Sequence, residues 1–374
     1  MALDLKMLDS LPDNLIELYA EVEQSILSDM ARRINSYDYF IPAAQHQKQK
    51  LQELGMVRED IISALSSLTG KSQQEIIDML TEAEAQTIED DVEYYTAAEV
   101  YAPDKVDTEA LYKNLNAGIV KTQRAFFNIT GTTANTSSKQ FERALDKVWA
   151  QVNTGTLDYN TAITNAIREL SEKGLGSIEY KNGRIDNIEV AVRRAAMTGI
   201  NQTAMITQET LADQLGVDLV EVTAHGGARP EHAKWQGKIY SRNGKKTING
   251  ETFEDLRAAT GYGKVTGLGG VNCRHSFHPY VYGTSKTYTQ KQLEEYNAKK
   301  IEYNGEKYTE YEASQIQRGI EREIRKAKRT IAAVEAAGGD ASSEKTKLRA
   351  LQKQYTEFSN QTGIKKQQAR TKIG

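Results

Sequence analysis

The first hundred residues repeat apolar side chains at the three- and four-residue spacing of a helix. One series runs from Leu15 through Val22 to Met30, and a second starts at Leu51, after the break at Pro42. This pattern predicts two helices between residues 10 and 71. Ser72 followed by Glu75 is typical of a capping box, which predicts the start of a third helix there. Because no compact core is evident around these helices, residues 1–103 are predicted to be a helical docking region.

The next segment, residues 104–179, is predicted to be a helical middle region. Helical spacing of apolar residues returns over 111–127, 139–152 and 159–173. Between the first two of these stretches, residues 130–138 have the sequence TGTTANTSS. So polar a run predicts an exposed loop.

The pattern changes between residues 180 and 283. Asn182 and Gly183 stand between residues that can pair as strands, which predicts a hairpin. A helical stripe over 188–215 ends at Gly216, and residues 217–224 alternate as in a strand. The glycines at 261, 263, 267, 269 and 270 indicate a backbone that needs positive dihedral angles or close approaches. We therefore expect a small Gly-rich α+β module over residues 180–283.

The last segment, residues 284–374, returns to helical periodicity. A long helix is predicted over 306–337, a break at Gly338 and Gly339, and a second helix over 343–358. This pattern predicts a helical hairpin or coiled-coil arm. The predicted fold class is mainly α, with an elongated helical N-terminal region, the small module and this C-terminal arm.

Composition narrows the class of protein. With 374 residues, 39% hydrophobic and 26% charged, the chain is long enough for two or three domains. A single cysteine excludes an intramolecular disulfide framework, and the N-terminus lacks the apolar run of a signal peptide, so we expect folding in the cytosol. No stretch approaches the roughly 20 apolar residues of a membrane span. The net charge is only -3, but residues 82–109 are acidic and residues 318–372 basic, which predicts different neighbours for each.

The candidate chemistry is concentrated between residues 217 and 283, which hold four of the five histidines and the cysteine. Imidazole nitrogen and thiolate are ligands that zinc prefers, and four of them close a structural site. His225, His232, Cys273 and His275 are therefore predicted to converge, either as a Cys₁His₃ zinc site or as a hydrogen-bonded core without metal. His278 is an additional histidine beside them, and its role is left open.

Other residues of the same stretch complete the predicted cluster. Arg229 and Arg274 can bind phosphate or pair with a carboxylate such as Glu231 to fix the loop, and we favour the structural role. Trp235 is expected to anchor the module by packing. The predicted structural cluster is His225, Arg229, His232, Trp235, Cys273, Arg274 and His275. A catalytic role, with Glu231 as a general base beside a metal-bound water, needs an open coordination position; no catalytic residue is assigned.

The basic arm offers a candidate surface for DNA. A run of positive charge usually forms only a solvated face, but each phosphate that it neutralises releases counterions and adds affinity without reading sequence. The predicted nucleic-acid-binding residues are Arg318, Arg322, Arg325, Lys326, Lys328 and Arg329.

Three segments carry a resemblance to a known family. They are TAHGGARPEHAKWQGKIYS at 223–241, TGYG at 260–263 and NCRHSFHP at 272–279. With QIQRGIEREIRKAKR at 315–329, they resemble phage minor capsid protein 2, a family distantly similar to the Mu F-like head morphogenesis proteins. The resemblance is specific over 180–283 and only general before residue 180.

The resemblance implies a minor structural protein of a tailed-phage head. Such a protein is made in the host cytoplasm and lies in the virion at the portal vertex, where it acts in assembly, DNA packaging or genome delivery. The implied partners are the portal protein, the major capsid protein and packaged DNA. We further expect a chain lacking the residues up to about Asp104 to fold yet fail to enter particles. The alternatives are a metal-dependent hydrolase or nuclease, a toxin-like transferase carried by the central module, and a plain DNA-binding protein.

Overall fold

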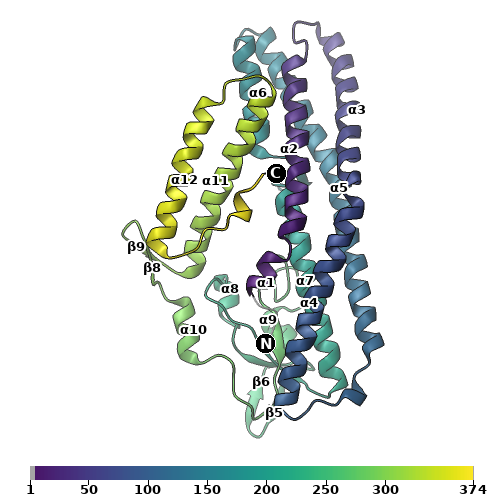
Figure 1. Cartoon of the computed structure of the whole chain (residues 1–374), viewed down its shortest axis with the longest axis vertical. Helices are drawn as coiled ribbons and strands as arrows, with labels where there is room; N and C mark the ends of the chain where they lie inside the picture. Colours follow the sequence, from purple (N-terminus) through teal and green to yellow (C-terminus); the bar gives the residue numbers. More distant parts are fainter. Residues whose placement is uncertain (1–4, 374) are drawn as a thin grey trace. The chain divides into compact units, whose positions relative to one another are not determined.

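The computed structural model describes residues 5–373 (Figure 1), and this part of the chain is mainly helical, as predicted. Its contacts divide it into two compact units. Unit 1 contains Met1–Asp13, Gln74–Arg124 and Arg194–Ile316, and unit 2 contains Asn14–Gln73, Ala125–Arg193 and Gln317–Gly374. No helix within residues 5–373 combines the length and apolarity needed to span a membrane. The predicted segment boundaries at residues 103, 179 and 283 remain predictions.

Helices account for most of the elements. In chain order they are α1 (Leu5–Ser10), α2 (Asp13–Ser36), α3 (Ala43–Ser67), α4 (Thr69–Ala97), α5 (Thr108–Asn153), α6 (Tyr159–Lys173), α7 (Ile188–Gln214), α8 (Pro230–Ala233), α9 (Leu256–Thr260), α10 (Gln290–Asn297), α11 (Glu310–Ala336) and α12 (Ser342–Thr362). Short 3₁₀ turns occur at Pro103–Lys105 and Ala369–Thr371. The predicted helix over 188–215 is confirmed as α7.

Strands form small antiparallel pairings. The hairpin predicted around Asn182 and Gly183 is confirmed as β1 (Gly176–Glu179) with β2 (Ile185–Asn187). The strand predicted at 217–224 is β3 (Leu219–Val222), the centre of a three-stranded sheet between β4 (Ile239–Ser241) and β7 (Phe277–Pro279). Two further hairpins join β5 (Lys246–Ile248) to β6 (Glu251–Phe253) and β8 (Ile301–Tyr303) to β9 (Glu306–Tyr308).

The loop predicted at 130–138 is wrong, because this stretch lies inside α5. Three of the hydroxyl groups that suggested a loop, those of Thr133, Thr136 and Ser137, are buried and bond to β1 within unit 2. Thr133 Oγ1 donates to Ser177 Oγ at 2.8 Å, and Ser137 Oγ donates to the Gly176 carbonyl at 3.0 Å. A polar stripe is stable on a buried helix face when each hydroxyl finds a partner.

The predicted capping box is also wrong, since α4 begins at Thr69 and Ser72 lies within its first turn. The Ser72 hydroxyl donates to the Thr69 carbonyl at 3.1 Å. Tertiary packing overrides the local signal here, because Ser72 is only 4% exposed.

The N-terminal helices belong to a core, contrary to expectation. Side chains of α2 such as Leu27, Met30 and Ile34 are at most 1% exposed within unit 2. Removing residues up to about Asp104 therefore deletes core side chains, and the structure gives no support to the expected folding of that truncated chain.

The C-terminal helical hairpin is confirmed within unit 2. A turn with Gly338 at a φ of +75° separates α11 from α12, and the two helices lie side by side (Figure 1). The Tyr355 hydroxyl of α12 donates to Glu321 of α11 at 2.6 Å, and Lys347 pairs with Glu323 at 3.4 Å. The long helix predicted over 306–337 starts later, because residues 306–308 form β9.

Candidate functional site

Two motif segments leave the same end of the three-stranded sheet in unit 1. The first runs from the end of β3 to the start of β4, and it is closed by the Gly237 N–H, which donates to the Val222 carbonyl at 2.9 Å. The second leads into β7, and the Thr223 N–H donates to the Ser276 carbonyl at 3.0 Å. Antiparallel pairing of β3 with both neighbours thus brings residues 223–237 and 272–276 together.

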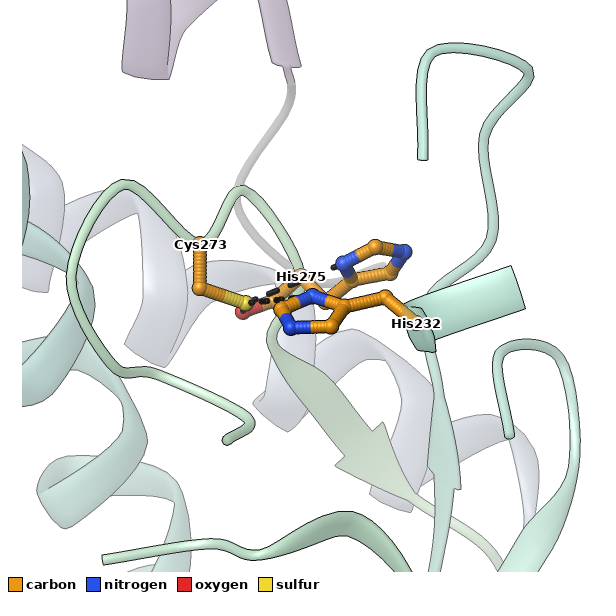
Figure 2. A group of neighbouring side chains, drawn as sticks. All are labelled: His232, Cys273 and His275. Carbon is orange, nitrogen blue, oxygen red and sulfur yellow. Dashed lines mark hydrogen bonds between the residues drawn. The ribbon is translucent and has the colours of Figure 1, made fainter. Parts of the chain in front are cut away.

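His232, Cys273 and His275 converge in this region (Figure 2). Cys273 Sγ lies 3.7 Å from His232 Nδ1 and 3.7 Å from His275 Nδ1. The three side chains are at most 3% exposed, and their potential ligand atoms all lie within 4.8 Å of one another. His232 projects from α8, while Cys273 and His275 lie on the segment that enters β7.

Neighbouring groups fix which nitrogen of each ring carries the proton. His232 Nε2 lies 3.1 Å from the Thr266 carbonyl, which can only accept. His275 Nε2 lies 3.0 Å from Gln236 Oε1, and that atom must be the amide oxygen because it also accepts the His225 N–H at 3.0 Å. Both rings therefore carry their proton on Nε2 and present an unprotonated Nδ1 to the sulfur.

The Gly-rich stretch positions the carbonyl that orients His232. Gly261 and Gly269 have positive φ angles of 67°, as the sequence predicted for this segment. A Cβ at Gly267 would lie 2.0 Å from the Gly261 carbonyl oxygen, so only glycine permits this close approach. Because Thr266 immediately precedes Gly267, this approach sets the position of the Thr266 carbonyl.

His225 lies beside the other three side chains with a different orientation. Its ring stacks on His275, with centroids 4.4 Å apart and an interplanar angle of 29°, and its buried Nε2 has no hydrogen-bond partner among the described residues. Stacked rings direct their in-plane lone pairs side by side, not at one common point. The structure therefore places His225 next to the convergence of His232, Cys273 and His275, but outside it.

Burial keeps the imidazoles of His225, His232 and His275 and the thiol of Cys273 uncharged. It lowers the pKa of His225 to about 3, with a smaller effect from the Arg274 guanidinium. Burial likewise lowers the pKa values of His232 and His275, and it raises the pKa of the Cys273 thiol. At neutral pH the metal-free site holds neutral imidazoles and a neutral thiol.

Arg229, Arg274 and Trp235 contact the motif segments. Arg229 Nη2 donates to the Val271 carbonyl at 3.2 Å, and Arg274 pairs with Asp9 of α1. Trp235 is 8% exposed, and its ring lies 4.6 Å from that of His232 and 4.8 Å from that of His275. Both arginines thus bind groups of the protein itself, a carbonyl and a carboxylate, and Trp235 packs against the two imidazoles.

Two residues that the sequence analysis did not single out support the site. Asn201 of α7 is 2% exposed, and its Nδ2 donates to the carbonyls of Cys273 at 3.1 Å and His275 at 3.0 Å. Gln236 fixes His275 as described above. Asn201 and Gln236 are polar amides with other polar residues nearby in the sequence, and nothing in the local sequence indicates their partners.

His278 has a separate role, and Glu231 faces away from the cluster. His278 lies opposite Glu221 in the β3–β7 register, 3.6 Å from Nε2 to the carboxylate, and both side chains are buried. Glu221 also accepts the Thr287 N–H at 2.9 Å and so fixes the chain after β7. Glu231 is exposed although its neighbour His232 is buried.

The predicted nucleic-acid-binding residues of α11 are divided between internal pairs and the surface of unit 2. Arg329 is 5% exposed and lies 3.8 Å from buried Glu23, while Arg325 pairs with Glu189 at 2.7 Å. Lys328 donates to the Thr371 carbonyl at 2.7 Å, and Lys326 pairs with Glu172 at 3.3 Å. Arg318 is half-buried and Arg322 is exposed. Arg325 and Arg329 are thereby committed to protein carboxylates, so they do not form an open phosphate-binding face.

Comparison with known proteins identifies the family of this chain. The family model described as phage minor capsid protein 2 matches residues 3–360. A protein named "Structural protein" from Lactococcus phage LL-H is 28% identical over 214 residues, which cover 56% of this chain and 54% of that protein. The chain thus spans about half the length of this relative. No solved structure matches. Because the family model covers nearly the whole chain, this protein belongs to the phage minor capsid protein 2 family.

Proposed function

We propose that this phage structural protein is associated with the portal vertex of a tailed-phage head and acts in head assembly, DNA packaging or genome delivery. The observation that supports the proposal is the family match over residues 3–360, which includes the histidine and cysteine segments of the candidate site. The proposed partners are the portal protein and the major capsid protein of the same phage. The proposed location is the virion, after synthesis in the host cytoplasm.

An exposed apolar face on α3 supports protein docking by the N-terminal helices. Leu51 and Ile62 are 66% and 41% exposed, and their separation of eleven residues places them three turns apart on one side of the helix. Phe40, just before α3, is 72% exposed. Exposed large apolar side chains on one side of a helix are typical of a protein interaction site. We therefore assign this face to a partner within the particle.

DNA contact is a second part of the proposal, and it now depends on the outer side chains of the arm. Arg322 on α11 and Arg349 on α12 are exposed and can reach phosphate. The buried Arg329 cannot contribute. The proposed contact is therefore weaker than the charge run in the sequence suggests.

The enzyme alternatives receive no support from the geometry of the cluster. A catalytic metal must reach both its ligands and a substrate. His232, Cys273 and His275 are at most 3% exposed, and the candidate base Glu231 lies on the exposed side of α8. A structural role for the cluster fits these positions better.

The docking proposal can be tested with a pair of matched double variants. Leu51→Glu with Ile62→Glu places two charges on the proposed face, and Gln45→Glu with Gln52→Glu places the same two charges at exposed polar positions of α3. Because all four positions are exposed, both variants should keep the wild-type stability within about 0.5 kcal/mol. Each is supplied to a phage that lacks its own copy, and incorporation is measured by quantitative mass spectrometry of purified particles.

We expect the Leu51/Ile62 variant to be strongly depleted from particles and the Gln45/Gln52 variant to be incorporated normally. Normal incorporation of both variants would remove α3 from the docking surface. Loss of both variants from particles would mean that added charge, and not the apolar face, determines incorporation.

A further inference from the structure

We propose that His232, Cys273 and His275 form a buried zinc site that joins the two motif segments of unit 1. The ligand atoms are His232 Nδ1, Cys273 Sγ and His275 Nδ1 (Figure 2). This inference concerns the chemistry of the module and does not depend on the proposed location in the particle.

The spacing of the ligand atoms fits a tetrahedral ion. With Zn–S of about 2.3 Å and Zn–N of about 2.0–2.1 Å, tetrahedral geometry separates sulfur from nitrogen by about 3.6 Å. Both observed separations are 3.7 Å. Two of the three ligand separations therefore already fit an ion, and all three ligand atoms lie within 4.8 Å of one another.

The count of protons favours a cation over a simple hydrogen bond. Both Nδ1 atoms are acceptors, because Thr266 and Gln236 place the ring protons on Nε2. The thiol has one proton, and three acceptors surround the sulfur: the two Nδ1 atoms and the His275 carbonyl at 3.7 Å. One S–H cannot satisfy two imidazole lone pairs, whereas a zinc ion bound to the thiolate satisfies both.

The surrounding hydrogen bonds are those that a metal-binding histidine requires. Ligating imidazoles usually donate their other N–H to a carbonyl or carboxylate, which fixes the ring orientation. His232 and His275 each have such an oxygen already in place, from Thr266 and Gln236. Asn201 holds the backbone of Cys273 and His275 on the other side. The hydrogen bonds of Thr266, Gln236 and Asn201 thus preorganise the site.

The protein supplies three ligands, and because all three are at most 3% exposed, the fourth position, which a non-protein ligand takes, is closed to substrate. His225 is not the fourth ligand, because its ring stacks on His275 and is not directed at the sulfur. Sulfur and nitrogen ligands in a tetrahedral arrangement select zinc over magnesium or calcium.

The test measures zinc in the purified full-length protein after dialysis against zinc and removal of unbound metal. We expect about one zinc per chain for the wild type and for His225→Asn, and a loss of at least about tenfold for Cys273→Ala and His275→Ala. His225→Asn is the matched control, because it alters a buried histidine of the same cluster. A wild-type protein that retains no zinc would overturn the proposal, and loss of zinc from His225→Asn equal to that from Cys273→Ala would overturn the three-ligand assignment.

Two measurements on the wild type keep the proposal testable if the variants fail to fold. Replacement of zinc by cobalt should produce a thiolate-to-cobalt charge-transfer band, and a cobalt protein without this band would exclude Cys273 as a ligand. A strong chelator should lower the Tm by on the order of 5 °C, and added zinc should restore it. An unchanged Tm after complete metal removal would contradict a site that joins the two segments.

Discussion

Two glycines allow α5 and α7 to approach closely within unit 1. Because of this contact, replacing a glycine at the interface and replacing one elsewhere in α5 should change stability in opposite directions. A Cβ added at Gly118 of α5 would lie 2.2 Å from Thr203 Oγ1, and one added at Gly199 of α7 would lie 2.5 Å from Thr122 Oγ1. Each helix thus presents a glycine and, four residues later, a threonine that faces the glycine of the other helix. Small residues at such a crossing let the backbones come together.

Gly118→Ala should destabilise the protein although alanine favours a helix. Alanine gains about 1 kcal/mol in helix propensity over glycine. The added methyl group would lie 2.2 Å from an oxygen, and nonbonded atoms prefer roughly 3.5 Å, so α5 and α7 must separate. Overpacking of this kind costs about 1–3 kcal/mol, and separation of the helices also loosens neighbouring contacts. We expect a net loss of about 1–2 kcal/mol.

Gly131→Ala is the matched control because it lies in the same helix with nothing within 4 Å of the new Cβ. It should stabilise the protein by about 0.5–1 kcal/mol through helix propensity alone. Thr203→Ala removes the nearest atom facing Gly118, so it should restore part of the stability lost in Gly118→Ala.

The assay is urea and thermal unfolding of the full-length chain, followed by far-ultraviolet circular dichroism. Gly118 lies in unit 1 and Gly131 in unit 2. If the two units unfold in separate transitions, Gly118→Ala should shift one transition and Gly131→Ala the other. A Gly118→Ala protein that is more stable than the wild type, by as much as Gly131→Ala, would refute the close approach of α5 and α7.

Three further predictions concern buried and exposed charges. Burial raises the pKa of Asp91 from 3.8 to about 7, so the folded state binds a proton that the unfolded state releases, and wild-type stability falls between about pH 4 and pH 7. Asp91→Asn should therefore raise the Tm progressively over that range and by a constant amount above it. A difference in Tm that does not change with pH would contradict the burial of Asp91. Arg329→Met leaves buried Glu23 without its guanidinium partner and should cost about 3–5 kcal/mol in urea unfolding, and a loss below about 1 kcal/mol would contradict the pairing. If the arm contacts DNA, Arg322→Ala should reduce the slope of log affinity against log salt by about 1, and an unchanged slope would exclude that contact.

Local spacing and turn residues predicted most of the helices and the β1–β2 hairpin, but not the β5–β6 and β8–β9 hairpins. The helix over 188–215 and the turn at Asn182 and Gly183 are examples. The stretch at 130–138 was mispredicted because its hydroxyls are satisfied by β1, about forty residues later in the chain. No local pattern carries that information.

The sequence located the candidate site but not its internal geometry. Rare side chains clustered in two segments, and the structure brings His232, Cys273 and His275 together. The orientation of His225 follows from stacking, and the proton positions follow from Gln236 and Thr266, whose contacts depend on how the segments pack. The charge run in α11 was misleading for Arg329, since charge alone does not say which side of an amphipathic helix faces a buried carboxylate.

The location of the protein in the particle is the central functional claim, and an asymmetric cryo-electron microscopy reconstruction of the intact phage tests it most directly. The account predicts density for this fold at the single portal vertex, in contact with the portal protein and in few copies. Density for the fold distributed over the icosahedral shell, or none at the portal vertex of particles shown by mass spectrometry to contain the protein, would contradict it.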